Sequence, residues 1–147
     1  MKYIATVLPF FLIAGLSVPA LAQMERVIHQ TFEVGKASEI HLDLYGKYSI
    51  EPWAGNNILT ETKIQVYDAP AHVLDFFVNE KGRYEILDAL NEEAGILQLS
   101  SRDKRRAGIQ YKETTCYEFV ELRVFIPDSF SAQSETVLVR QAEKSDN

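Results

Sequence analysis

Three aromatic residues, Tyr45, Tyr48 and Trp53, lie within nine positions of one another, around Gly46 and Pro52. Exposed aromatic rings offer a large contact area at a low entropy cost, so such a cluster can stack on sugar rings or anchor a protein partner. Buried aromatic rings serve instead as core and edge packing, which is the commoner role. The cluster is therefore a candidate ligand-binding site, and the exposure of its rings decides between the two interpretations.

A second candidate site is the one concentration of positive charge, formed by Arg102, Lys104, Arg105 and Arg106 and interrupted by Asp103. In an acidic chain, such a cluster can attract an anionic glycan or a membrane headgroup. The alternative is a solvated loop tip whose charges keep a strand edge from pairing with another chain. We favour the loop tip and keep the four residues as binding candidates.

Cys116 is the only thiol, and a cysteine beside a histidine can act as a nucleophile. The possible partners are His29, His41 and His72. The strand spacing, however, places Cys116 on the same face as Val120, and free cysteine is among the most frequently buried residue types. We therefore interpret Cys116 as a small buried hydrophobic residue.

The remaining patterns that could support chemistry are weak. His41 and Asp43 share a strand face at a spacing of two, but two ligands do not make a metal site and no further ligand lies at a fixed distance. The sequence contains no G-x-S-x-G elbow, no H-E-x-x-H, no P-loop and no dinucleotide-binding glycine pattern. We predict no catalytic residues, no metal site and no cofactor, and we expect that the protein is not an enzyme.

Charge and cysteine content narrow the possible partners. The 147 residues carry 15 Lys and Arg against 21 Asp and Glu, a net charge of −6. General nucleic-acid binding needs a basic surface that displaces counterions, so this composition argues against it. A single cysteine excludes an intramolecular disulfide framework and a multi-cysteine zinc site.

The first 22 residues have the three parts of an export signal. Lys2 makes the start basic, positions 4–18 are almost continuously apolar, and small residues precede a cleavage site after Ala22. The apolar run is shorter than the roughly 20 residues that span a bilayer, and no second long apolar run follows. We predict export to the periplasm or the outer cell surface, with a net charge of −7 once the signal is removed.

The elements that must position these candidate residues follow a period of two, which is typical of strands with one buried face. The pattern is clearest at 58–66, where Ile58, Ile64 and Val66 alternate with charged residues. Other strands are expected at 31–34, 40–44, 48–50, 84–86, 96–99, 116–126 and 136–139. The segment 100–115 is polar and is expected to form a long loop or a hairpin tip.

The last long strand, 116–126, carries Tyr117, Phe119 and Phe125 on its otherwise polar face. Aromatic residues on that face indicate burial on both sides. We therefore expect a second layer, the helix or another chain to cover it.

One segment departs from the period of two. Ala71, Leu74 and Phe77 have helical spacing, with a proline suited to the first turn and Gly82 suited to the end. This predicts one short helix, at about Pro70–Lys81. We expect a single mainly β domain over residues 23–140, either a short solenoid or roll or a sandwich, with antiparallel and stacked strands. Residues 141–147 are expected to form a disordered tail.

Several spaced aliphatic residues and turns resemble those of the auto-transporter adhesin (head GIN domain) family of exported bacterial proteins. The resemblance lies in Ile40-x-Leu42-x-Leu44-Tyr45-Gly46-x-Tyr48-x-Ile50, Gly55-Asn56-Asn57-Ile58, Gly95-x-Leu97-x-Leu99 and Val120-x-Leu122-x-Val124-x-Ile126-Pro127. It implies a β-solenoid or roll in the cell envelope, with no catalytic residues to transfer. The chain departs from the family in its helical insert and in ending about twenty residues after Pro127.

These observations lead to two hypotheses for function. The first is an exported, non-catalytic β domain of the cell envelope, structural or adhesin-like, whose partner is an envelope glycan or another envelope protein. The alternative is a periplasmic small-ligand or glycan-binding protein that uses the cluster of Tyr45, Tyr48 and Trp53.

Overall fold

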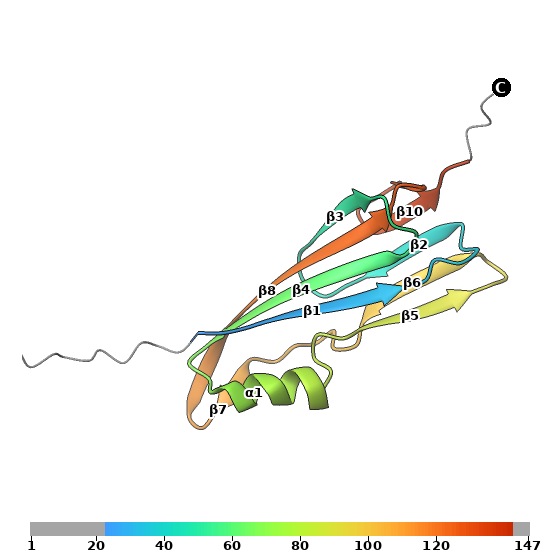
Figure 1. Ribbon diagram of the computed structural model, residues 1–147. Coiled ribbons are helices and arrows are strands. Elements are labelled where there is room, and N and C mark those ends of the chain that lie inside the picture. Colours follow the sequence, from blue (N-terminus) through green and yellow to red (C-terminus); the bar gives the residue numbers. More distant parts are fainter. Residues whose placement is uncertain (1–22, 143–147) are drawn as a thin grey trace, which may run out of the picture.

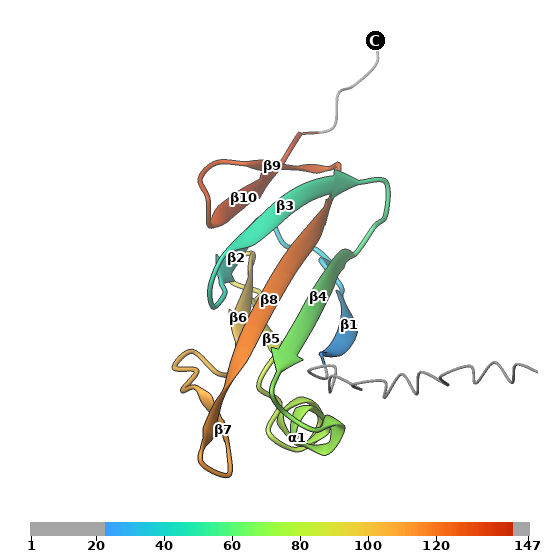
Figure 2. The same cartoon turned by 90° about the vertical axis from the view of Figure 1, so that its left-hand side faces the viewer.

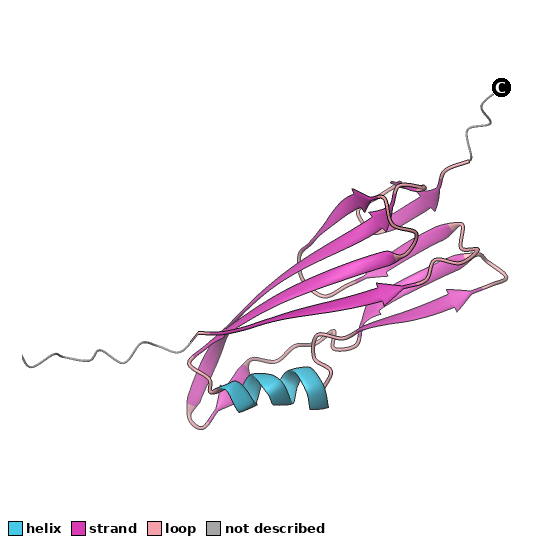
Figure 3. Cartoon of the chain, in the orientation of Figure 1, coloured by secondary structure: helices cyan, strands magenta, loops and turns pink. Residues whose placement is uncertain are grey.

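The computed structural model describes residues 23–142, so the predicted export signal and most of the predicted tail lie outside the described range. Two five-stranded sheets pack against each other, and one short helix lies at one end of the molecule (Figure 1). Most of the chain forms strands, as the period of two predicts, and there is one short helical segment (Figure 3). Among the predicted alternatives, the two-sheet arrangement corresponds to the sandwich.

The first sheet has the strand order β1-β4-β8-β3, with β7 paired to β8 outside this path. All of its pairings are antiparallel except that of β3 with β8, which is parallel. Its strands are β1 (Met24–Phe32), β3 (Tyr48–Trp53), β4 (Ile58–Tyr67), β7 (Ile109–Tyr111) and β8 (Thr114–Pro127).

The second sheet has the strand order β5-β6-β2-β10-β9. Here β2 and β6 are parallel and the other neighbours are antiparallel. Its strands are β2 (Glu39–Asp43), β5 (Ile86–Asn91), β6 (Ile96–Ser101), β9 (Phe130–Ala132) and β10 (Val137–Arg140).

The turn at Gly46 carries the chain from one sheet to the other, because β2 and β3 are consecutive strands that do not pair with each other. Gly46 adopts a φ of 79°, which a glycine reaches without the steric cost of a Cβ. The N–H of Tyr45 donates to Ser101 Oγ at 2.9 Å, so the entry to the turn is tied to the end of β6. Tyr45 at the start of this turn lies beside Arg106, which comes from the loop before β7.

The long strands β4 and β8 lie side by side and run toward the helix (Figure 2). Each contributes residues to both hydrophobic clusters. One half of each strand faces the second sheet, where Ile58 and Val124 lie in the larger cluster. The other half faces the helix, where Ile64 and Cys116 lie in the smaller cluster. The predicted alternation along β4 is confirmed, because every inward residue from Ile58 to Val66 is buried. The two clusters therefore share a single pair of strands.

The predicted helix is confirmed and consists of two turns of different pitch. α1 (Ala71–Asp75) continues directly into the π-helical turn η1 (Phe76–Glu80), which ends where the N–H of Lys81 donates to the carbonyl of Phe76 at 3.0 Å. Gly82 follows with a φ of 57°. Leu74 is buried against the first sheet and Phe77 is partly buried there, as predicted, but Val73 is the other buried residue and Ala71 is exposed.

Several strand boundaries differ from those predicted, and β9 was not predicted. β1 begins at Met24 rather than at residue 31, because pairing with β4 along nine positions holds a segment whose own side chains are mostly exposed. In the segment 100–115 the predicted hairpin tip is confirmed, because β7 forms a hairpin with β8 through a turn at Lys112, where φ is 55°. Tyr84 precedes β5 instead of lying within it.

Side chains join the two sheets where their edges meet. The Gln30 amide donates to the carbonyl of Ile86 and accepts from the N–H of the same residue, both at 3.0 Å, so it substitutes for strand pairing between β1 and β5. At the other edge, the Tyr48 hydroxyl donates to the carbonyl of Glu135 at 3.0 Å. These hydrogen bonds join the edges of the two sheets.

Candidate functional site

A guanidinium held between two tyrosine rings is the most distinctive polar arrangement among the described residues. The Arg106 Cζ atom lies 4.6 Å from the ring centroid of Tyr45 and 5.0 Å from that of Tyr84. Tyr45 comes from the turn after β2, Tyr84 from the segment between the helix and β5, and Arg106 from the loop between β6 and β7. The Tyr45 ring is 41% exposed, whereas Tyr84 is buried. Three distant segments thus converge on one cation.

A buried ion pair lies beside this arrangement. Arg83 donates through Nε and Nη2 to the two carboxylate oxygens of Glu118 at 3.1 and 2.7 Å, and through Nη2 to the carbonyl of Ala107 at 2.7 Å. The second carboxylate near Arg83 is that of Asp103, at 3.7 Å. Burial alone would raise the pKa of Glu118, but the hydrogen bonds and charge of Arg83 outweigh it and hold that pKa below its ordinary value. Both charges of this pair are therefore satisfied.

Arg106 has no such partner in the described part of the chain. Neither a hydrogen bond nor an ion pair joins its guanidinium to a described residue, and its Nε is buried without an acceptor. Burial lowers the pKa of Arg106, because a desolvated cation is less favourable, and the charge of Glu118 offsets this only in part. Arg106 stays protonated at any physiological pH, since the ordinary pKa of arginine is above 12.

A cleft of about 210 Å³ opens beside this guanidinium. Its lining residues come from the turn after β2, the loop before β7 and the middle of β8: Tyr45, Gly46, Lys47, Arg106, Glu118 and Val120. A second cleft of about 550 Å³ shares Gly46 and Lys47 with the first and also includes Tyr48 and Glu135. The turn at Gly46 therefore separates two neighbouring hollows.

The predicted aromatic cluster is divided by the fold. Tyr45 lines the first cleft and Tyr48 the second. Trp53 lies at the far end of β3, where its Nε1 donates to the carbonyl of Asn57 at 2.9 Å and its ring lies 6.4 Å from that of Phe125. Proximity in sequence therefore does not make one aromatic site here, because β3 extends Tyr48 and Trp53 away from each other.

The four residues of the predicted basic cluster also have different surroundings. Arg102 pairs with Glu85 at 2.7 Å, and Lys104 pairs with Asp43. Arg105 is exposed, and Arg106 occupies the space between the two tyrosine rings. The pairs of Arg102 and Lys104 fix the loop, and only Arg106 contributes to a cleft.

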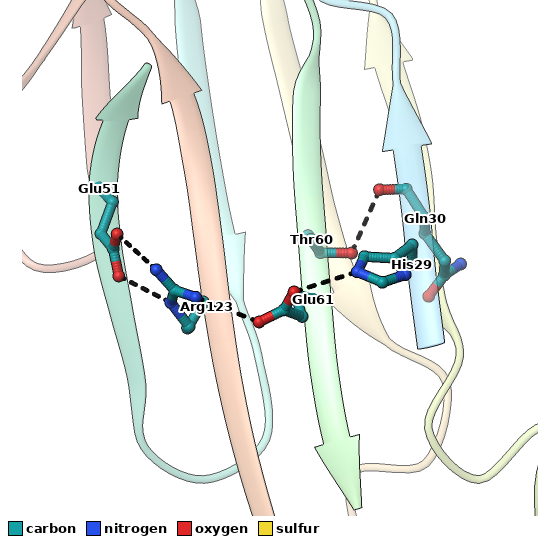
Figure 4. A network of polar contacts seen from close by, with 6 residues as sticks. All are labelled: His29, Gln30, Glu51, Thr60, Glu61 and Arg123. Carbon is teal, nitrogen blue, oxygen red and sulfur yellow. Dashed lines mark hydrogen bonds and ion pairs between the residues drawn. The ribbon is translucent and has the colours of Figure 1, made fainter. Parts of the chain in front are cut away.

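The outer face of the first sheet carries a charge network that crosses four strands (Figure 4). Arg123 on β8 donates to both carboxylate oxygens of Glu51 at 2.9 Å and to Glu61 at 3.2 Å, and His29 Nε2 lies 3.0 Å from the other oxygen of Glu61. The hydrogen bonds from Arg123 lower the pKa of Glu51 and raise that of Arg123. Every charge in this network has a partner.

The same outer face exposes aromatic rings farther along β8. Tyr117 is 68% exposed and Phe119 is 61% exposed. The Phe119 ring meets that of Tyr67 edge-on at 5.9 Å, whereas Phe125 lies beneath the Arg123 guanidinium at 4.8 Å. We name Tyr67, Tyr117 and Phe119 the aromatic strip. The expectation that the helix or a second layer covers this face is wrong for the described residues, because the helix packs on the opposite face.

Cys116 lies in the smaller hydrophobic cluster and is buried, as predicted. Burial raises the pKa of its thiol, which donates to the carbonyl of Asp68 at 3.5 Å. His41 contacts Glu39 at 2.7 Å, and His72 meets the Tyr111 ring edge-on. Residues 23–142 contain no group of three or more histidine, cysteine, aspartate or glutamate side chains placed to hold a metal ion.

The most important residues that sequence reasoning missed are Arg83, Tyr84 and Glu118. Glu118 lies 35 positions after Arg83, and neither charge pattern nor spacing connects it to Arg83 and Tyr84. The only sequence signal is the Arg83-Tyr84 pair itself, which follows the glycine that ends the helix. Lys47, which lines both clefts, was also not among the predicted site residues.

Comparisons with family models, with curated proteins and with solved structures found no match to this chain. Within residues 23–142, no helix is long and apolar enough to cross a membrane.

Proposed function

We propose that the chain is an exported, non-catalytic β domain of the bacterial cell envelope with a structural or adhesin-like role. The observation that carries this proposal is the aromatic strip on the outer face of the first sheet. Large apolar rings at this level of exposure are costly to hydrate, and they are the residues that anchor partners at interfaces. Neither the helix nor the second sheet covers them among the described residues.

The surroundings of the strip support a binding role. Lys63, Gln65 and Glu121 flank Phe119 in a shallow hollow, so the apolar ring has a polar rim. The charge network around Arg123 crosses the same face and ties β1, β4, β8 and β3 together. A surface held in this way needs little ordering when it meets a partner, which lowers the cost of binding.

The test is co-sedimentation of the purified protein with isolated cell-envelope glycan. We expect the native protein to sediment with the glycan, and the variant Tyr117→Ser/Phe119→Ser to remain in solution. The matched control is Val27→Ser, which removes another exposed apolar side chain from the same face and is expected to bind like the native protein. Equal sedimentation of the native protein and the double variant would contradict the proposal.

The first cleft favours a second candidate function, that of a small-ligand or glycan-binding protein. The Tyr45 ring is exposed beside a hollow lined by Arg106 and Lys47, which places an aromatic face next to polar donors. Small-ligand sites combine these two features in a concave surface. Tyr45 therefore remains a ligand-binding candidate, with Tyr48 in the neighbouring cleft.

A further inference from the structure

Four of the seven arginine side chains in residues 23–142 contact a carboxylate, whereas Arg140 donates to two backbone carbonyls and Arg105 is exposed. Arg26 contacts Asp75, Arg83 contacts Glu118, Arg102 contacts Glu85, and Arg123 contacts Glu51 and Glu61. Arg106 contacts none among the described residues, although it is among the more buried of these arginines. Removing a cation from water without giving it a counter-charge is unfavourable, so this position costs the fold stability.

The two tyrosine rings hold the Arg106 guanidinium without satisfying it. Rings whose centroids lie 4.6 and 5.0 Å from Cζ attract the cation through their π faces. They are not acceptors of ordinary hydrogen bonds, whereas a guanidinium carries five N–H donors in a rigid plane. The arrangement therefore fixes the cation in place and leaves its Nε without an acceptor among the described residues.

The charges around the cleft favour an anion. Lys47 and Arg106 line it, and the one lining carboxylate, Glu118, is already bound by both donors of Arg83. The nearest other carboxylates are also engaged, since Asp103 faces Arg83 and Asp43 pairs with Lys104. A ligand that entered this cleft would meet two cations and no free carboxylate.

We propose that this cleft binds the anionic group of an acidic sugar, a carboxylate or a phosphate, through Arg106 and Lys47. Guanidinium groups bind both anions through paired hydrogen bonds, and the exposed Tyr45 ring supplies a face for the sugar ring. The volume of about 210 Å³ suits one sugar unit rather than a long chain. This inference rests on the second candidate function and specifies its ligand class.

The test is calorimetric titration of the purified protein with glucuronate, glucose 1-phosphate, glucose and inorganic phosphate. We expect binding of one or both acidic sugars, with glucose at least about ten-fold weaker. Preference for glucuronate identifies a carboxylate ligand, and preference for glucose 1-phosphate identifies a phosphate ligand. Inorganic phosphate alone is expected to bind more weakly than glucose 1-phosphate, because it lacks a ring for Tyr45.

Two arginine variants separate a specific site from general attraction by positive charge. Arg106→Met is expected to weaken acidic-sugar binding at least about ten-fold. Arg105→Met removes the same charge from the adjacent exposed position and is expected to leave binding unchanged. An equal loss in both variants would overturn the proposed site. Thermal unfolding of each variant verifies that it is folded.

The outcomes also distinguish this inference from the function on which it rests. If glucose and the acidic sugars bind equally and Arg106→Met has no effect, the anion site is wrong and glycan binding stands. If no sugar binds to the folded native protein, both are wrong.

Discussion

The outer face of the first sheet and the cleft beside Gly46 differ in the partners that they give to an arginine side chain. On the outer face, Arg123 is 38% exposed at its side chain and contacts two carboxylates. In the cleft, Arg106 lies between two tyrosine rings and contacts none among the described residues. Charge pairing is thus complete where water already solvates the ions, and incomplete where an unpaired ion is more costly.

The pair of Arg83 and Glu118 shows that this difference is not a matter of depth. Arg83 is only 4% exposed, yet it donates hydrogen bonds to both carboxylate oxygens of Glu118. The fold can therefore place a counter-charge in this part of the molecule. That counter-charge, Glu118, lines the same cleft as Arg106. An unpaired cation beside a paired one is the pattern expected of a site that a ligand completes.

Removing Arg83 is expected to have the largest effect on stability. Arg83→Met leaves the largely buried Glu118 carboxylate without its two hydrogen bonds from the guanidinium, so the free energy of unfolding should fall by about 3 kcal/mol. Urea denaturation measures this change. The double variant Arg83→Met/Glu118→Leu should recover most of the loss, because it also removes the carboxylate that the single variant leaves without its arginine. A loss below about 1 kcal/mol in the single variant would mean that the pair is hydrated and that the contrast with Arg123 is false.

The same pair is expected to make stability depend on pH. In the folded state the pKa of Glu118 lies below its ordinary value of 4.5. The stability that this group contributes is therefore present above pH 4.5 and is lost as the pH falls through its folded pKa. In the double variant Arg83→Met/Glu118→Leu, the acid side of the stability profile should be less steep. Parallel acid profiles for the native protein and the double variant would contradict this assignment.

Removing Arg106 is expected to change stability by less than about 1 kcal/mol. Two effects oppose each other in Arg106→Met: the attraction to the rings of Tyr45 and Tyr84 is lost, and the cost of burying an unpaired cation disappears. Thermal unfolding in the absence of ligand measures the balance. A loss comparable to that of Arg83→Met would show that Arg106 has a structural partner, and it would remove the difference between the two regions.

The smallest effect is expected on the outer face. Arg123→Gln breaks contacts between exposed groups, which water and salt already weaken. We expect a slight decrease in melting temperature at low salt and no decrease at 1 M salt, about one order of magnitude above physiological ionic strength. Melting curves at both salt concentrations provide the measurement. A large decrease in melting temperature that persists in high salt would mean that the network behaves like a buried ion pair, which would contradict this prediction.

The elements with strict alternation could be predicted from the sequence. β4 and β8 follow the period of two because one face of β4 is buried throughout, and one face of β8 over most of its length, by the second sheet or the helix. The helix was predictable because its apolar stripe is bounded by a proline and Gly82. Local pattern suffices where a single face meets a continuous core.

The site could be predicted only in part. Tyr45 and Arg106 were both candidates, but in separate clusters, and their contact depends on a turn that passes between sheets. Tyr84 and Glu118 complete the arrangement from segments with no local signal. The exposure of Tyr117 and Phe119 was also not predictable, because an aromatic residue on a strand normally indicates a covering layer.

The most direct test of the central claim is an NMR titration that observes the arginine Nε–Hε signals. The Nε atoms of Arg83 and Arg123 already donate to Glu118 and Glu51, whereas that of Arg106 has no acceptor among the described residues. On addition of the acidic sugar that binds most tightly, we predict that the Arg106 signal shifts and that the signals of Arg83 and Arg123 do not. A shift of the Arg123 signal with no shift of the Arg106 signal would contradict the account.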